Sequence, residues 1–189
     1  MNTRLDHRLR DFFHVYLRDQ RSVSPNTIKS YRDTFKLLLA YLGSKRRSSK
    51  PLAVQDLDAK IILAFLRHLE DPVDGRGNCA QSRNLRLAAV QCFFKYISLH
   101  VPAIERQAKR IFAIPAKRVH PKAADSLDRK ELEALLAQPQ TSSADGMRDL
   151  AILTFLYNTG ARAQEAADAR DIWFDFANRT VSIIGKGQR

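Results

Sequence analysis

Cysteine is scarce in this sequence, and long apolar runs are missing. The two cysteines, Cys79 and Cys92, lie 13 positions apart, without a Cys-x-x-Cys pair or nearby histidines. This spacing favours neither a zinc site nor a disulfide framework. No apolar run reaches the roughly 18 residues that span a bilayer, and the charged segment from Met1 to Arg10 lacks the apolar core of a secretory signal. We therefore expect a cytoplasmic protein with no membrane partner, no metal and no cofactor.

Acidic side chains are also scarce, but only in one part of the chain. The 189 residues carry a net charge of +12. Residues 1–120 hold 23 Lys and Arg against 10 Asp and Glu, whereas the remaining 69 residues hold 9 against 10. A positive excess confined to one region suits a polyanion-binding surface, because each neutralised phosphate releases condensed counterions. Double-stranded DNA is therefore the first candidate partner, and a basic solubilising surface is the alternative.

Four helical patterns occupy the first hundred residues, each with apolar positions at three- and four-residue intervals. Apolar positions of the first pattern are Leu5, Leu9, Phe12, Phe13 and Tyr16. The second begins at Ser24 and Pro25, which suit a helix N-terminus, and Gly43 is expected to end it. The third begins near Asp58, and the fourth covers about residues 80–99. This region is predicted to be a helical domain.

Prolines mark a change of character after the helices. Ile114-Pro115 and His120-Pro121 disfavour a continuous helix in a segment rich in basic residues. We therefore predict a helical domain over residues 1–101, a basic linker over 102–124 and a second domain over 125–189.

The second domain mixes helical and strand patterns. Asp128 caps the first expected helix, and residues 147–157, apolar almost all round, predict a helix packed within a core that ends at Gly160. Residues 171–175 and 180–184 are rich in β-branched and aromatic side chains and predict a two-stranded hairpin.

A polar basic loop follows the second helix. Residues 44–51 include Lys45, Arg46, Arg47 and Lys50. The run is either an ordinary solvated linker or an arm that contacts phosphates, and the sequence leaves both interpretations open.

Several segments together resemble the tyrosine recombinase (phage integrase) family, in the family's order. Residues 24–32 and 81–96 resemble the first and last helical signatures of its DNA core-binding domain. Residues 148–153, then Thr159-Gly160-Ala161-Arg162 with Glu165, then Gly185-Lys186-Gly187, resemble the start of its catalytic domain. The resemblance implies a mainly α protein, with a four-helix SAM-like core-binding domain followed by an incomplete α+β catalytic domain of helices and a β-hairpin.

The resemblance also assigns roles to three residues. Arg162 is implied to be the first catalytic arginine, because a guanidinium can donate two bonds to a phosphoryl group whose charge builds in the transition state. Glu165, three residues later, is close enough to brace Arg162. Lys186 is implied to be the hairpin lysine that protonates the departing 5′ oxygen. Each also has a plain interpretation: a helix end, a solvent-facing glutamate and an ordinary hairpin turn.

The sequence departs from the family after Lys186. The family completes its site with a His-x-x-Arg element, a further histidine or tryptophan, and a tyrosine nucleophile. All five tyrosines here precede Lys186. We therefore expect a chain that binds DNA without cutting it alone. Full-length members act as tetramers on DNA, and a fragment of this kind is expected to be monomeric when free.

Three functions remain open from the sequence. The first is a DNA recombination or integration protein, the second is a non-catalytic DNA-binding remnant that competes at recombination sites, and the third is a helical protein-interaction domain. For the first two, arginines suit guanine edges and lysines suit phosphates. The candidate DNA contacts are Lys29, Arg32, Lys45, Arg46, Arg47, Arg83 and Arg86.

Overall fold

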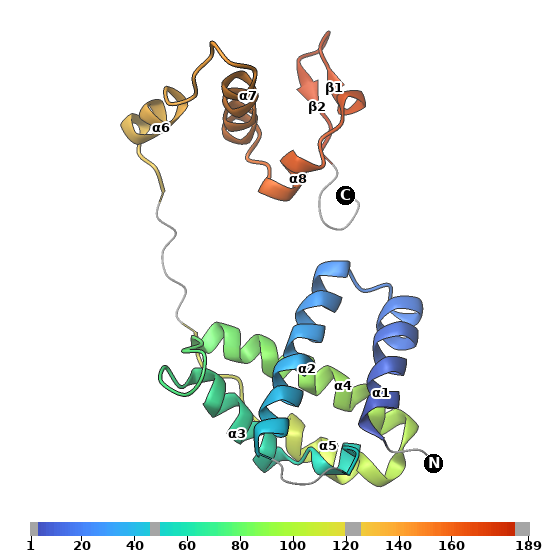
Figure 1. Cartoon of the computed structure of the whole chain (residues 1–189). Helices are drawn as coiled ribbons and strands as arrows, with labels where there is room; N and C mark the ends of the chain where they lie inside the picture. The colour runs from blue at the N-terminus through green and yellow to red at the C-terminus, as the bar shows by residue number, and fades with distance from the viewer. Residues whose placement is uncertain (1–3, 46–49, 120–125, 184–189) are drawn as a thin grey trace. The chain divides into compact units, whose positions relative to one another are not determined.

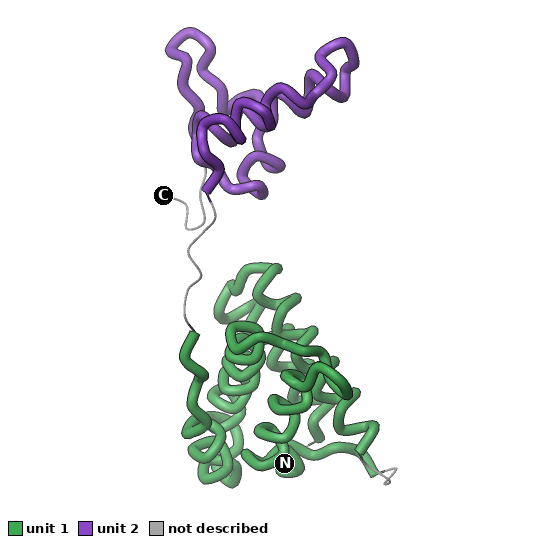
Figure 2. Tube along the Cα trace, turned by 90° about the vertical axis from the view of Figure 1, so that its left-hand side faces the viewer, with its two compact units in different colours: residues 1–121 green, residues 122–189 purple. Residues whose placement is uncertain are grey.

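The chain forms two compact units in a computed structural model that describes residues 4–45, 50–119 and 126–183. The first unit covers residues 1–121 and the second covers residues 122–189 (Figure 2). Helices dominate both, and a small antiparallel hairpin lies in the second (Figure 1). The predicted mainly helical class is confirmed. No helix within the described ranges is long and apolar enough to cross a membrane.

The first helix changes its winding along its length. Helix α1 (Leu5–Asp11) continues directly into π-helical turns over Phe12–Gln20 (η1). At their end, the backbone N–H of Arg21 donates to the carbonyl of Tyr16, 3.0 Å away and five residues back. This wider turn explains why the buried positions pass from Phe12 to Leu17, a five-residue step. Leu17 was not among the apolar positions that the sequence predicted for this helix.

Helix α2 (Pro25–Lys45) begins where the sequence predicts and ends later. The Ser24 hydroxyl accepts the backbone N–H of Thr27 at 3.3 Å, as an N-terminal cap does. The prediction that Gly43 ends the helix is wrong. A glycine ends a helix by taking a left-handed conformation, which Gly160 has (φ 63°) and Gly43 does not.

Two further helices match their predicted starts. Helix α3 (Ala59–Glu70) is capped by Asp58, whose carboxylate accepts the backbone N–H of Ile61 at 2.7 Å. A short 3-10 turn, η2 (Val54–Asp56), precedes it. Helix α4 (Ala80–His100) contacts α2, α3 and the helix that follows it, so it is the central helix of the unit (Figure 1).

A fifth helix lies where the sequence predicted only a linker. After a 3-10 turn, η3 (Pro102–Ile104), helix α5 covers Glu105–Phe112. Its apolar side chains Ala108 and Ile111 are buried, as is Ile114 beyond it. The linker prediction for 102–124 is therefore wrong for residues 102–114. The prolines lie outside α5, at its two flanks, and the basic residues occupy its exposed face.

The core of the first unit is aromatic. Phe12, Phe35 and Phe93 are almost fully buried, and the ring of Phe93 packs edge-on against both of the others at 5.3 and 5.2 Å between centroids. Edge-on packing of this kind adds to the stabilisation from apolar burial. The core therefore fixes α2 and α4 as a rigid support for the polar residues on their outer faces.

Residues 126–183, the described part of the second unit, form three helices and the hairpin. Helix α6 (Arg129–Leu136) begins at Asp128 with a reciprocal capping box to Glu131. Helix α7 (Ala144–Thr159) is followed by α8 (Ala163–Ala167). A 3-10 turn, η4 (Asp171–Trp173), leads into strands β1 (Phe174–Asp175) and β2 (Thr180–Val181), paired with Phe174 opposite Val181. The hairpin is confirmed with shorter strands, and residue 184 of the predicted strand lies outside the described residues.

The prediction that residues 147–157 pack within a core is wrong for the structure described. Met147, Ile152 and Tyr157 on α7 are largely exposed. Among residues 126–183, only Gly146 is buried. A side chain there would collide with the backbone of Gln140, since an added Cβ would lie 1.9 Å from its carbonyl oxygen. The described elements are too few to cover a helix that is apolar on all sides.

Candidate nucleic-acid interface and phosphate-binding residues

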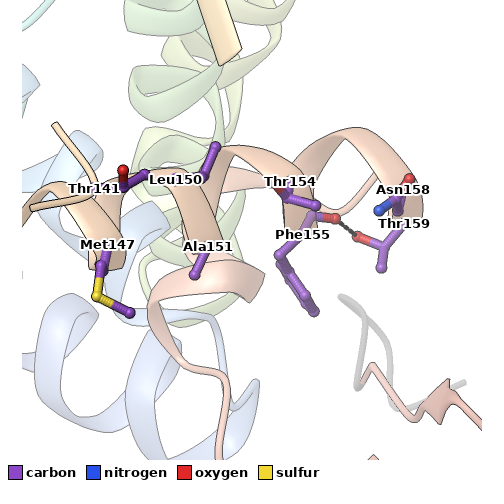
Figure 3. Close-up of a pocket in the computed structure, with 8 residues that line it drawn as sticks. All are labelled: Thr141, Met147, Leu150, Ala151, Thr154, Phe155, Asn158 and Thr159. Carbon is purple, nitrogen blue, oxygen red and sulfur yellow. Dashed lines mark hydrogen bonds between the residues drawn. The ribbon is translucent and has the colours of Figure 1, made fainter. Parts of the chain in front are cut away.

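The C-terminal end of α7 positions Arg162. Gly160 takes the left-handed conformation that ends the helix, and the Thr159 hydroxyl donates to the carbonyl of Phe155 at 2.6 Å (Figure 3). The same hydroxyl oxygen accepts the backbone N–H of Ala161 at 3.2 Å. Thr159 therefore fixes the chain on both sides of the glycine, and Arg162 lies at the start of α8.

Arg162 and Glu165 form a compact pair. The guanidinium Nη1 of Arg162 donates to one carboxylate oxygen of Glu165 at 2.7 Å, and the backbone N–H of Arg162 donates to the other at 2.8 Å. The Glu165 side chain is 14% exposed, whereas that of Arg162 is 74% exposed. Glutamate therefore holds one edge of the guanidinium and leaves most of the group facing solvent, where a planar set of donors can bind a phosphate.

The contact with Arg162 also lowers the pKa of Glu165. Hydrogen bonds from the backbone N–H of Arg162, and then from its guanidinium, lower the pKa of Glu165 below its ordinary value of 4.5. The shift therefore extends the ionised form of the carboxylate to more acidic solution than an ordinary glutamate allows. Lys186, the predicted proton donor, lies outside the described residues.

An apolar groove runs along the same helix. Its lining includes Met147, Leu150, Ala151 and Phe155, with Thr159 at one end (Figure 3). No charged side chain lines the groove among the described residues, in contrast to the basic cleft of the first unit.

The first unit carries a basic cleft between η1 and α2. We define its basic face by four exposed cations: Arg18, Lys29, Arg32 and Lys36. Asp33 is the acidic residue in the lining, so positive charge dominates. Lys29 and Arg32 are where the sequence predicts DNA contacts. Arg18 and Lys36 were missed, although Lys36 follows Lys29 by seven residues and a helix places such residues on one side.

Arg83 was predicted to contact DNA and does not lie on the surface. The residue is 4% exposed, and its Nη1 donates to the carbonyl of Pro115 at 2.8 Å. The DNA-contact prediction for Arg83 is therefore wrong in this structure. Its place on α4 points the side chain toward the segment that follows α5, which the sequence did not reveal as packed.

Arg86 is half-buried and joins two helices. Its Nη1 donates to the carbonyl of Ser30 at 3.0 Å and to the hydroxyl of Thr34 at 3.1 Å, both on α2. Thr34 is itself buried. We therefore assign Arg86 to packing between α4 and α2, in place of the predicted DNA contact. A charged donor of this kind makes the stronger class of hydrogen bond.

The predicted basic arm is only partly described. Lys45 is the exposed last residue of α2. Arg46 and Arg47 lie outside the described residues. Both interpretations of the arm therefore stay open.

Comparison with known proteins covers both units. Residues 10–99 match the phage integrase N-terminal SAM-like domain, and residues 125–189 match the phage integrase family. An integrase/recombinase of Sinorhizobium fredii, y4rC, is 40% identical over 185 residues, which is 96% of this chain and 54% of the relative. Another from the same organism, y4rD, is 36% identical over 96% of this chain and 64% of the relative.

A more distant relative is named as a tyrosine recombinase. The tyrosine recombinase XerD of Lacticaseibacillus casei is 28% identical over 179 residues, covering 95% of this chain and 56% of the relative. The chain thus spans between about half and two thirds of the length of these relatives. The two matched regions lie in the same order as the two units. The chain belongs to the phage integrase family of tyrosine recombinases.

Proposed function

We propose that this protein binds duplex DNA through the basic face of its first unit and acts in site-specific recombination or integration. The observation that carries the proposal is the cluster of Arg18, Lys29, Arg32 and Lys36, all exposed on one cleft above a rigid aromatic core. Family membership supports DNA as the polyanion. Counterion release would then drive association.

The four cations have different tasks in this proposal. Lys29 and Lys36 hold phosphates as point charges about two turns apart on α2. Arg32 lies between them along the helix and presents a planar guanidinium, which can reach a guanine edge or bind a phosphate with two bonds. Arg18, on η1, extends the charge across the cleft.

Arg162 is proposed to bind a phosphate at the reacting position. Glu165 holds one edge of its guanidinium and keeps the group oriented before DNA arrives. An oriented donor stabilises charge that develops in a transition state without reorganising at that moment. Lys186 would supply the proton to the leaving oxygen, as the family resemblance implies.

We propose further that the 189-residue chain binds DNA but does not cut it alone. Of its tyrosines, Tyr16, Tyr31, Tyr41 and Tyr96 are packed in the first unit, and Tyr157 is an exposed residue of α7. None follows Lys186, where the family places its nucleophile. A nicked suicide substrate tests this point, because a covalent protein–DNA adduct formed by this chain would contradict it.

The binding proposal has a direct test with a charge-matched control. Lys29→Ala, Arg32→Ala and Lys36→Ala together remove three cations from the basic face. Lys60→Ala, Arg106→Ala and Arg110→Ala remove three from the α3–α5 side, which are also exposed. Fluorescence anisotropy on a labelled duplex should show binding at least about tenfold weaker for the first triple variant. The control should stay within about threefold, and equal losses would mean that only total charge matters.

A further inference from the structure

We propose that helix α4 holds residues 113–117, which we call the exit segment, through a polar latch centred on Asn84. The latch fixes the place where the chain leaves the first unit on its way to the second. Asn84 is therefore a positioning residue that acts on the connection between the units. Residues 113–117 lie entirely within the first unit, so the latch contacts are independent of how the two units are arranged.

The side-chain amide of Asn84 forms two reciprocal hydrogen bonds with the backbone of the exit segment. Its Nδ2 donates to the carbonyl of Lys117 at 2.7 Å, and its Oδ1 accepts the backbone N–H of Lys117 at 2.9 Å. Both ends of the amide are used on a single residue, 33 positions away in the sequence. A reciprocal pair constrains direction as well as distance, because a rotated amide would place like groups against each other.

Arg83 fixes the orientation of that amide. Its Nη1 donates to Asn84 Oδ1 at 3.1 Å and to the carbonyl of Pro115 at 2.8 Å. A guanidinium is only a donor, so the atom of Asn84 that faces it must be the oxygen. The nitrogen of Asn84 is then directed to the Lys117 carbonyl. The buried arginine thus orients Asn84 and also binds the exit segment itself.

Two further contacts extend the latch. Gln91 lies seven residues after Asn84 on α4, and its Nε2 lies 3.3 to 3.4 Å from the carbonyls of Ile111, Phe112 and Ile114. At the other end, the ammonium of Lys117 pairs with the carboxylate of Glu70 on α3 at 2.6 Å. Gln91 on α4 therefore holds the chain up to Ile114, whose side chain is buried, and Glu70 on α3 holds it at Lys117.

The latch limits how far the second unit can reach. Eleven residue steps lead from Lys117 to Asp128, the cap of α6, and can extend over at most roughly 36–40 Å. If Ile114 were the last anchor, fourteen steps could extend over roughly 46–50 Å. The latch therefore removes about 10 Å of reach. If both units hold DNA, which rests on the proposed function, the latch restricts the positions on the DNA that Arg162 can reach.

Amide exchange followed by NMR tests the latch in the free 189-residue chain. The Lys117 N–H should be protected in the wild type and should exchange about tenfold faster in Asn84→Ala, since both bonds of the pair are removed. Gln81→Ala removes an exposed amide one turn earlier on α4 and should leave the rate unchanged. The Phe93 amide should keep its protection in both variants. Equal Lys117 rates in Asn84→Ala and the wild type would overturn the proposal.

A second variant breaks the latch from the opposite side. Lys117→Pro removes the N–H without altering α4, so it keeps the test valid if Asn84→Ala disturbs the fold. Spin labels at Arg67→Cys and Lys130→Cys, with Cys79→Ala and Cys92→Ala, then report the distance between the units. The longest distances should increase by up to about 7 Å in Lys117→Pro, because Arg83 still binds the carbonyl of Pro115 and only two further residues are released. Unchanged distances in Lys117→Pro would contradict the claim about reach, and neither measurement involves DNA.

Discussion

The two units organise their functional residues by different means. In the first, a buried aromatic core supports α2 and α4, and the basic face depends on helices held by contacts distant in sequence. In the second, within residues 126–183, only Gly146 is buried, and the Arg162–Glu165 pair is formed by neighbours in the chain. The basic face is therefore a product of tertiary packing, whereas Arg162 is positioned by a local cap.

The largest expected effect is a loss of stability caused by a substitution in the core of the first unit. Phe93→Ala removes a fully buried ring that contacts Phe12 and Phe35 and should lower the free energy of unfolding by about 3–5 kcal/mol. Phe176→Ala, in the second unit, removes a ring that is 83% exposed and should change it by less than about 0.5 kcal/mol. Urea denaturation followed by circular dichroism measures both. Similar losses would show that the second unit has a comparable core.

The next effect separates a structural arginine from one that we propose to contact DNA. Arg86→Ala removes a donor to Ser30 and Thr34 and should cost about 1.5–3 kcal/mol of stability. Arg32→Ala removes an exposed residue of the basic face and should cost less than about 0.5 kcal/mol. Thermal or urea unfolding distinguishes them. If Arg32→Ala were the more destabilising change, our assignment of the two arginines would be reversed.

A smaller effect tests whether binding resides in the first unit. Arg162→Ala removes one exposed donor from the second unit and should weaken duplex binding by no more than about threefold, because the basic face remains. Anisotropy titration at fixed salt gives the affinity. A loss as large as that of the basic-face triple variant would move the principal contact to the second unit.

The smallest effect concerns the local cap itself. The depressed pKa of Glu165 means that the folded state favours its ionised form, so the pair contributes stability above the ordinary glutamate pKa of 4.5. That contribution should be lost as pH falls below 4.5 through the lower folded-state value. NMR titration of the Glu165 carboxyl should show the depressed pKa, and Arg162→Ala should move it back toward 4.5. An unchanged pKa in Arg162→Ala would contradict the bracing contact.

The sequence predicted features that arise from local chemistry. Ser24, Asp58 and Asp128 cap the helices they were expected to begin, and Gly160 ends α7. The Arg162–Glu165 contact follows from a three-residue spacing at a helix start. Such features need only a few neighbouring residues, which the sequence displays directly.

Tertiary features were harder to predict. Arg83 is buried because residues 113–117 return to α4, and no local pattern around Arg83 indicates that partner. Helix α5 is short and strongly basic, so its charge suggested a linker although Ala108 and Ile111 pack into the core. For α7, the apolar pattern predicted burial, but burial depends on which elements cover the helix.

The salt dependence of duplex binding tests the central claim most directly. For the wild-type chain, log K should fall linearly with log salt concentration. Removing Lys29, Arg32 and Lys36 should make that slope shallower by about 2.7, or about 0.9 for each phosphate that the variant no longer neutralises. The charge-matched triple variant at Lys60, Arg106 and Arg110 should keep the wild-type slope. A wild-type slope near zero, or equal slopes for the two triple variants, would contradict a basic face that binds the DNA backbone.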